Sequence, residues 1–270
     1  MNKNILNYFG SVHTGYLHAR GKISTHKSIE LLELKPNETI LDVGFGTGVT
    51  LVQIASENKN INCFGLDISM VMYKKALERI WICGLSDRIK LTLLKEKNKF
   101  PYPDNTFDKV YAESIIAIQE GDDFRNILIE IKRVLKPNGL FIINETIWLE
   151  STELETIKQI NSDNKRLYGI VQSNHDFPYL KDWKKLFSDI GFQCIFEISV
   201  SEIKPAKQKH LSAPMFLSDI YSLIGKIKSY IIPSLIKERI KFKKAMIETT
   251  NSTNMLEGVI LKSCNKKNSI

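Results

Sequence analysis

Residues 40–48 read Ile-Leu-Asp-Val-Gly-Phe-Gly-Thr-Gly, and this stretch is the strongest indication of the fold in the sequence. An apolar run of strand type enters a turn with three glycines, and a second apolar run, residues 49–55, leaves that turn as a helix. Gly44, Gly46 and Gly48 let the backbone approach a ligand more closely than any side chain would allow. Free N–H groups at the start of a helix favour anionic or polar ligand atoms. The stretch therefore predicts a site for a nucleotide-like cofactor.

Two acidic residues support this interpretation of the turn. Asp42 stands two residues before the first glycine, and Asp67 ends the short apolar run 63–67, about one βα unit further along. An acid at the end of a second strand can accept hydrogen bonds from both hydroxyls of a ribose. The spacing D-x-G-x-G-x-G differs from the G-x-G-x-x-G of dinucleotide-binding proteins, which disfavours a nicotinamide-dependent dehydrogenase. Each acid alone could be a solvated loop carboxylate, but with the glycines they predict a nucleoside site.

Five ordered motifs resemble those of the class I S-adenosylmethionine-dependent methyltransferases, in particular the branch with ubiquinone/menaquinone-type and sterol-type small-molecule methyltransferases. The resemblance spans roughly residues 28–200 and a last strand near 256–262. It implies S-adenosylmethionine as cofactor, S-adenosylhomocysteine as product, and a small hydrophobic or amphipathic acceptor methylated on oxygen, nitrogen or carbon. The motifs are the glycine turn at 40–48, Gly-Leu-Asp-Ile-Ser at 65–69, Phe-Pro-Tyr-Pro-Asp-Asn-Thr-Phe-Asp at 100–108, Glu-Ile-Lys-Arg-Val-Leu-Lys-Pro-Asn-Gly at 130–139 and the late helix at 182–192.

The resemblance also implies roles for individual residues. Asp42 and the glycines would line the methionine part of the cofactor, Asp67 would hold the ribose hydroxyls, and Ile68 would lie against the adenine. Glu113, after the fourth strand, would face the sulfonium with Ser114. The acid that holds the adenine amino group in the family has its best match here in Glu96, which lysines flank. The predicted cofactor-binding residues are Tyr16, Asp42, Gly44, Phe45, Gly46, Thr47, Gly48, Asp67, Ile68, Met72, Glu96, Lys97, Glu113 and Ser114.

Methyl transfer requires alignment of the acceptor with the methyl group, and it needs a general base only where the acceptor must lose a proton. The sequence therefore shows the cofactor site more plainly than the acceptor site. The stretch 16–21 resembles in part a Leu-His-Pro-Gly-Gly segment that packs over the cofactor in some relatives. His18 would then face the acceptor or merely pack a capping helix. The predicted catalytic residues are His18, Glu113 and Glu145.

Arginine and histidine side chains elsewhere in the chain are weaker candidates for the site. Arg20 would hold a carboxylate or phosphate, or form a surface salt bridge. His13, His26 and His175 are further candidate bases. His175 stands before a Phe-Pro pair in an expected loop, so we expect its side chain to be exposed to solvent.

Alternating strands and helices predict an α/β fold, namely a doubly wound, mostly parallel seven-stranded sheet with its ligand at the carboxyl ends of the strands. We expect an N-terminal helical cap at 1–27, a cofactor-binding core at 28–200, a helical insertion at 201–254, and the last strand with a tail at 255–270. The expected strands include 39–43, 62–66, 89–93, 109–112 and 139–144, and the expected helices include 28–34, 69–81 and 123–135.

The composition limits the remaining alternatives. The chain has 270 residues, a net charge of +8 and four cysteines without a C-x-x-C pair, which predicts neither a metal site nor a disulfide framework. The cysteines and the lack of a signal-peptide pattern predict a cytoplasmic protein. The charge admits an anionic partner, but a nucleic-acid methyltransferase is disfavoured because no base-amino motif or RNA-binding module is found. A cofactor-binding scaffold, or an enzyme that catalyses a rearrangement instead, is the other alternative.

The region 201–254 holds two apolar runs, residues 215–224 and 231–236. Lys226, Lys228 and Pro233 interrupt them, so they are too short to span a membrane. They predict amphipathic helices that would form a lid over the site, a peripheral contact with a membrane or lipid-like substrate, or a dimer contact. The sequence is compatible with a monomer or a homodimer.

Overall fold

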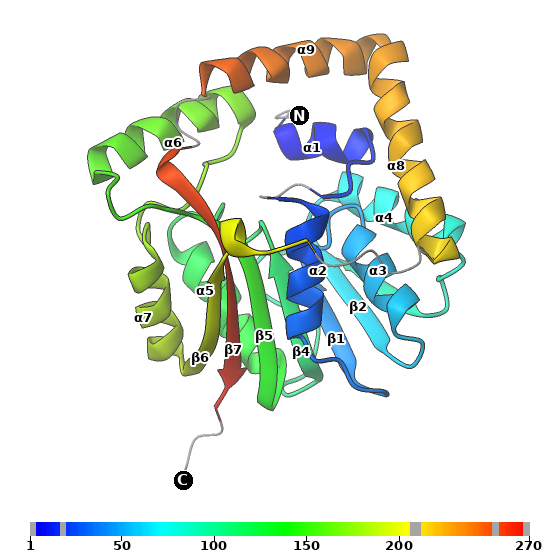
Figure 1. Ribbon diagram of the computed structural model, residues 1–270, viewed down its shortest axis with the longest axis vertical. Coiled ribbons are helices and arrows are strands. Elements are labelled where there is room, and N and C mark those ends of the chain that lie inside the picture. Colours follow the sequence, from blue (N-terminus) through cyan, green and yellow to red (C-terminus); the bar gives the residue numbers. More distant parts are fainter. Residues whose placement is uncertain (1–3, 17–19, 206–211, 250–253, 267–270) are drawn as a thin grey trace.

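One sheet of seven strands forms the centre of the molecule (Figure 1). The computed structural model describes residues 4–16, 20–205, 212–249 and 254–266. The strands are β1 (Thr39–Val43), β2 (Asn62–Asp67), β3 (Ile89–Leu93), β4 (Phe107–Glu113), β5 (Leu135–Trp148), β6 (Phe192–Ser199) and β7 (Leu256–Asn265). The helices are α1 (Ile5–Ser11), α2 (Lys22–Leu31), α3 (Val49–Glu57), α4 (Met70–Ile82), α5 (Asp122–Val134), α6 (Leu154–Tyr168), α7 (Leu180–Ile190), the short η1 (Val200–Glu202), α8 (Ala213–Ile231) and α9 (Pro233–Glu248).

The strand order is β3-β2-β1-β4-β5-β7-β6. β1 pairs in parallel with β2 and β4, and β7 alone runs antiparallel to its neighbours β5 and β6. The carboxyl ends of β1, β2, β4 and β5 therefore meet at one edge of the sheet, where ligands of such folds bind. The predicted doubly wound, mostly parallel seven-stranded sheet is confirmed.

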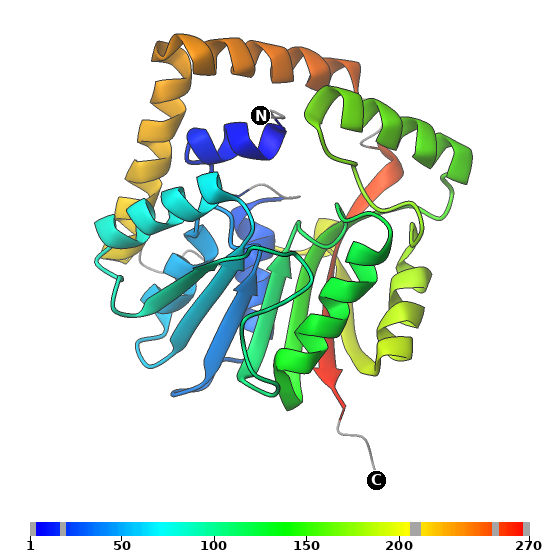
Figure 2. The same cartoon turned by 180° about the vertical axis from the view of Figure 1, so that it is seen from behind.

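Both faces of the sheet are covered, which explains why its strands are apolar runs without polar alternation. In β1, Ile40 packs with side chains of α2, α3 and α4 on one face. Leu41 and Val43 point to the other face and pack with α5 and α7. Figure 1 shows α2 and α3 in front of the sheet, and Figure 2 shows α5 and α7 on the opposite side.

Some elements differ in length from the prediction. The fifth strand, expected at 139–144, runs over Leu135–Trp148, because the Pro-Asn-Gly segment forms an irregularity in the pairing with β4 instead of a break. Its far end continues by pairing with β7, as far as Trp148 opposite Leu256. The helix expected at 28–34 is α2 and begins earlier, so it spans the expected boundary after residue 27.

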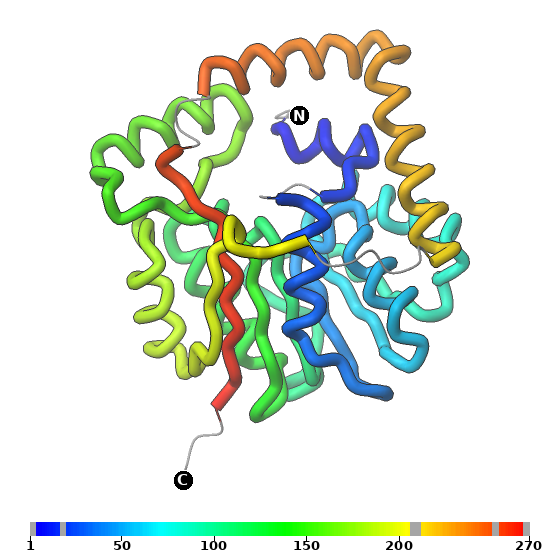
Figure 3. The backbone as a smooth tube through the Cα atoms, in the orientation of Figure 1, coloured from blue at the N-terminus to red at the C-terminus, as the bar shows by residue number. Residues whose placement is uncertain are grey.

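The insertion before the last strand is helical, as predicted. α8 stands beside α3 and α4, and α9 crosses above α1 towards α6, so that the two helices form an arch (Figures 1 and 3). Pro233 lies at the first position of α9, where a proline is tolerated, and it fixes the corner between the two helices. Among the described helices, none is long and apolar enough to cross a membrane.

Candidate active site

A cavity of about 680 Å³ lies at the carboxyl edge of the sheet. Its floor consists of the glycine turn after β1 and the ends of β2, β4 and β5. Residues of α1, α6 and α9 form its upper walls, and they include Leu6, Phe9, Tyr168 and Met246. Segments far apart in the sequence therefore enclose one space, of a volume typical of small-molecule sites.

The glycine turn approaches its neighbours so closely that a side chain would not fit. Gly44 has a φ of +77°, and a Cβ on this residue would lie 2.7 Å from Cγ1 of Ile115. The Gly44 N–H donates to the carbonyl of Leu66 at 2.8 Å, which joins the turn to β2. Gly46 also has a positive φ, but a Cβ there would meet no protein atom within 4 Å. The turn is thus packed on one side and open to the cavity on the other.

Asp67 ends β2 and is tied to the glycine turn. Its Oδ2 accepts the N–H of Gly46 at 3.0 Å, and its Oδ1 accepts the N–H of Ser69 at 2.8 Å. Burial raises the pKa of Asp67 to about 6, although these backbone hydrogen bonds oppose the shift. Two backbone contacts leave lone pairs on the carboxylate for a ligand, because an ionised carboxyl group has about four acceptor positions.

Two further carboxyl groups line the floor of the cavity. Asp42 is 2% exposed, and burial raises its pKa well above the ordinary value, with Glu113 and Asp67 adding to the shift. Glu113 accepts hydrogen bonds from Thr25 at 3.0 Å and from Asn144 at 2.6 Å, which hold its carboxylate at the end of β4. This end of the cavity therefore has a strongly acidic floor and favours a positively charged ligand.

Glu145 on β5 holds the turn that follows β4. Its Oε1 accepts the N–H groups of Ile115 and Ile116 at 3.0 and 2.9 Å, and its Oε2 accepts that of Ala117 at 3.3 Å. Burial raises the pKa of Glu145 to about 7. Both oxygens are thus engaged with the backbone. The role of acceptor-side acid expected for Glu145 stays a prediction.

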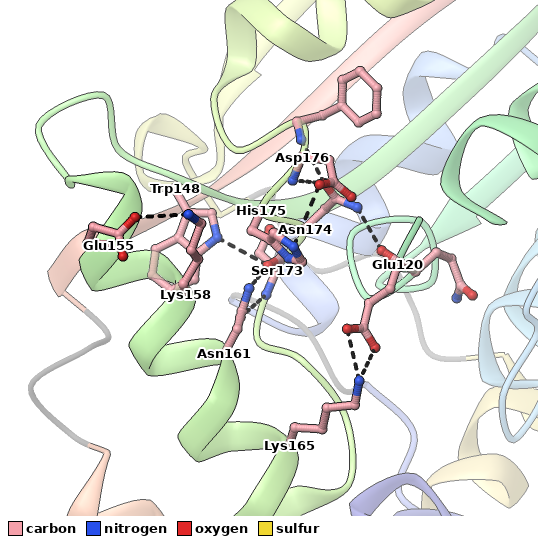
Figure 4. A network of polar contacts seen from close by, with 12 residues as sticks. Glu120, Trp148, Glu155, Lys158, Asn161, Lys165, Ser173, Asn174, His175 and Asp176 are labelled. Carbon is pink, nitrogen blue, oxygen red and sulfur yellow. Dashed lines mark hydrogen bonds and ion pairs between the residues drawn. The ribbon is translucent and has the colours of Figure 1, made fainter. Parts of the chain in front are cut away.

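Residues 170–172 form part of the cavity wall, and the segment that follows them is held by a polar network (Figure 4). Asn161 and the indole of Trp148 both donate to the carbonyl of Ser173, at 2.7 and 3.2 Å. Asn174 donates to the carbonyl of Gln119 at 2.8 Å, which joins this wall to the turn after β4. A rigid wall of this kind can hold an acceptor in one orientation.

Arg79 is fully buried and joins the glycine turn to the arch. Its guanidinium donates to the carbonyl of Thr47 at 2.8 Å, to that of His13 at 2.9 Å and to the hydroxyl of Ser218 at 2.7 Å. It also lies over the ring of Tyr221, with 5.0 Å between its Cζ and the ring centre. Burial lowers the pKa of Arg79 to about 10.

Most of the predicted cofactor residues are brought together around the cavity. Gly48 does not line it but begins α3 with a φ of +78°. Lys97 and Glu96 are exposed and lie outside the lining residues, and Lys97 contacts Asp123 at 3.2 Å. The Tyr16 hydroxyl donates to Gln53 at 3.3 Å, so it is directed to α3. The predicted residues that line the cavity are Asp42, Gly44, Phe45, Gly46, Thr47, Asp67, Ile68, Met72, Glu113 and Ser114.

The histidines and Arg20 lie elsewhere. His18 falls outside the described residues. His13 is buried away from the cavity lining and stacks on Tyr221 at 4.1 Å, and burial lowers its pKa to about 4. His175 lies 3.6 Å from Asp176 in the network of Figure 4, and His26 lies 3.3 Å from the amide of Gln53.

Arg20 donates to the carbonyls of Val200, Ser201 and Ile203. Among the described residues, these carbonyl groups around η1 and no carboxylate contact its guanidinium, so the expected salt bridge is not seen in this part of the chain.

The sequence predicted an N-terminal helical cap and offered a helical lid, but it did not predict which residues form the upper walls of the cavity. Asn4 and Phe9 of α1, Asn164 of α6, Gln172 and Met246 all line it. No motif marks these residues, because they come from segments far apart in the sequence and only the tertiary fold brings them together. The aromatic residues near the N-terminus are the one local indication that this segment covers the site.

The family model described as a methyltransferase domain matches residues 34–210, about two thirds of the chain. This chain therefore belongs to the methyltransferase-domain family, and the class predicted from its five motifs, the class I S-adenosylmethionine-dependent methyltransferases, is confirmed.

Three similar proteins illustrate the range of this family. Phosphoethanolamine N-methyltransferase 3 of Arabidopsis thaliana is 32% identical over 190 residues, which cover 70% of this chain and 36% of that protein. The ubiquinone/menaquinone biosynthesis C-methyltransferase of Rickettsia akari is 29% identical over 174 residues, covering 58% of this chain and 69% of that protein. The [4+2]-cyclase SpnF shares the fold with a TM-score of 0.66 at 20% identity, covering 93% and 86% of the two chains.

This chain spans about a third of the length of the plant phosphoethanolamine methyltransferases that it matches. The family model matches residues 34–210, a range that includes the glycine turn and Asp67.

Proposed function

We propose that this chain transfers the methyl group of S-adenosylmethionine to a small hydrophobic or amphipathic acceptor. The proposal rests on one observation. One continuous cavity begins at Asp67 and the glycine turn and extends to the apolar side chains of α1 and α9. Two similar proteins are, by name, a phosphoethanolamine N-methyltransferase and a C-methyltransferase of ubiquinone/menaquinone biosynthesis, which supports a small acceptor. A cytoplasmic location is part of the proposal and is supported by four free cysteines. The oligomeric state, monomer or homodimer, stays a prediction.

The residues at the floor of the cavity fit S-adenosylmethionine. Asp67 would accept the ribose hydroxyls, and Ile68, which is 44% exposed, would lie against the adenine. Asp42, Gly44 and Gly46 would hold the methionine part, since a Cβ on Gly46 would enter open space there. When bound, the cofactor supplies an electrophilic methyl group on a positively charged sulfur.

The protein's own contribution is alignment and exclusion of water. Thr25 and Asn144 hold Glu113 at the end of β4 by hydrogen bonds. Glu113 also lines the cavity, so its carboxylate would stabilise a cationic centre there. Glu145 would act indirectly, because it fixes the turn at 115–117 that borders the cavity. Orientation of this kind can lower the barrier by about 7–11 kcal/mol. His18 and Glu145 stay predictions as acid–base groups.

The upper end of the cavity supports an amphipathic acceptor. Leu6, Phe9 and Val171 supply apolar surface there. Asn164 donates to Gln172 at 3.0 Å, and its own carbonyl oxygen is buried without a hydrogen-bond partner. A buried acceptor of this kind favours a ligand that brings a hydrogen-bond donor. We therefore propose an acceptor with an apolar body and at least one N–H or O–H group.

The test combines binding with turnover. We expect the purified protein to bind S-adenosylhomocysteine in calorimetry, and Asp67→Ala to weaken this binding at least about tenfold through loss of a charge-assisted contact. Asp87→Ala, at an exposed acid in the turn before β3, is the matched control. With methyl-labelled S-adenosylmethionine, label should pass to amphipathic acceptors such as quinols or ethanolamine derivatives. Unchanged binding in Asp67→Ala would contradict the assignment of the site.

Non-methyl chemistry is the second candidate. A [4+2]-cyclase shares the fold over most of both chains, which supports the view that this architecture can serve a rearrangement. The two candidates differ in their products. Methyl transfer gives the acceptor the mass of one methylene group and releases S-adenosylhomocysteine, whereas a rearrangement does neither.

A further inference from the structure

An apolar stripe runs along the outward face of α8. It includes Phe216, Leu223, Ile224, Ile227, Tyr230 and Ile231, whose side chains are between 45% and 68% exposed. An α-helix turns by about 100° per residue, so these six side chains fall within an arc of about 120°. Figures 1 and 2 both show α8 at the outer edge of the molecule. Contiguous apolar surface of this kind marks interaction sites.

The opposite face of α8 fixes the direction of the stripe. Arg79 donates to both the carbonyl and the hydroxyl of Ser218, and the Tyr221 hydroxyl donates to Glu78 at 2.6 Å. Gly225 packs against the carbonyl of Val12 so closely that no Cβ would fit. A rotation of the helix would break all of these contacts. The stripe is therefore presented outward by the folded protein.

Positive charge borders the stripe on both sides. Lys226 and Lys228 lie about 40° beyond its two edges on the helical projection. Asp219 lies near the same edge as Lys226, but Lys22 is 3.7 Å away and balances its charge. Residues 213–248 contain seven Lys or Arg and three Asp or Glu, so this segment carries +4 of the net +8.

This combination favours one kind of partner. Lysines beside an apolar stripe can extend their ammonium groups to lipid headgroups while the apolar side chains enter the acyl boundary. Anionic lipids complement the surplus positive charge. A second copy of the chain would instead bring the same positive surplus against it.

We propose that α8 docks the protein on an anionic lipid surface, with the stripe in the plane of the interface. The helix lies on the membrane and does not cross it. This inference goes beyond methyl transfer and does not depend on it.

Vesicle binding tests the proposal with the full chain. We expect co-sedimentation with vesicles of equal parts phosphatidylcholine and phosphatidylglycerol, little with phosphatidylcholine alone, and weaker binding at high salt. The double variant Leu223→Glu/Ile227→Glu should lose at least about tenfold in partitioning, because charges would enter the acyl boundary. Leu154→Glu on α6, at a residue of similar exposure (47%), is the matched control and should bind like the wild type. Lys228→Gln should reduce binding about fivefold.

Other outcomes overturn the proposal. Wild-type protein that fails to bind the anionic vesicles contradicts it, and so does equal binding by the double variant. If light scattering shows that the wild type is a dimer and the double variant a monomer, and if the wild type does not bind vesicles, the stripe would be assigned to self-association. Circular dichroism and thermal unfolding should match between variants, since Leu154, Leu223 and Ile227 are solvent-exposed and Lys228 is only partly buried.

Discussion

Asp67 at the end of β2 accepts the N–H of Gly46 at 3.0 Å, so the two sequence motifs of the cofactor site form one hydrogen-bonded unit. The acid that would hold the ribose also fixes the open glycine of the turn. When a ligand contacts one motif, the other motif is therefore already positioned. Few protein groups then have to become ordered on binding, which reduces the entropic cost of binding.

Cofactor affinity should depend on pH through Asp67. Its pKa of about 6 in the folded protein lies above the ordinary value, so the carboxylate that accepts ribose hydroxyls is lost as the pH falls below 6. We expect S-adenosylhomocysteine to bind up to about tenfold more weakly at pH 5 than at pH 7. Asp67→Asn should bind weakly with a flatter profile. The same profile in wild type and variant would assign the titration to another group.

Gly44→Ala and Gly46→Ala should separate folding from binding. At Gly44 a Cβ would meet Ile115 at a positive φ, so we expect a loss of about 2–5 kcal/mol in the free energy of unfolding. At Gly46 a Cβ would point into open space, so only about 1–2 kcal/mol should be lost. S-adenosylhomocysteine affinity should nevertheless fall in Gly46→Ala, because the cavity is narrowed. Urea unfolding and calorimetry give both values, and equal stability losses would refute the packing argument.

Glu145→Gln should destabilise the protein in a pH-dependent way. A side-chain amide cannot replace both carboxylate oxygens towards the 115–117 turn, which costs about 1–3 kcal/mol. Because the pKa of Glu145 is raised to about 7, the folded state holds its proton up to that pH and the unfolded state only up to its ordinary value. The stabilising contribution is thus complete at low pH and is lost as the pH rises towards 7. The difference between wild type and variant should therefore shrink from pH 5 to pH 8 in urea unfolding. Glu153→Gln, at an exposed residue, should show no such trend.

Arg79→Met should loosen the arch and the glycine turn together. Loss of the guanidinium removes a charged donor from the carbonyls of Thr47, His13 and Ser218, so the free energy of unfolding should fall by at least about 3 kcal/mol. Amide exchange in α8 should accelerate beyond this global effect. Arg125→Met on the exposed side of α5 should stay within about 0.5 kcal/mol of the wild type. An Arg79→Met protein of wild-type stability would show that the network is dispensable.

The floor of the site could be predicted because its geometry is local. Asp42, Gly44 and Asp67 belong to consecutive βα units, and the spacing within such a unit determines where each side chain lies. The same logic fails for Arg79, whose partner Ser218 is 139 residues away. It fails again for Lys97, whose exposed side chain contacts Asp123, 26 residues away, and does not line the cavity.

The upper walls lie beyond local patterns for the same reason. Phe9 and Met246 face one cavity although most of the chain separates them. The sequence did predict that the insertion is helical, because the apolar periodicity of α8 and α9 is local. It did not predict which face of α8 would remain exposed, since this depends on how Tyr221 and Gly225 pack.

β6 and β7 are adjacent antiparallel strands, and Ser199 pairs with Val259 although the whole arch lies between them in the sequence. In topological terms the arch is an oversized hairpin loop whose two ends meet. Such an inserted segment can be exchanged, shortened or lost without altering the register of any strand. Natural variation could therefore remodel acceptor choice and subcellular attachment in this segment while the donor half of the enzyme stays constant.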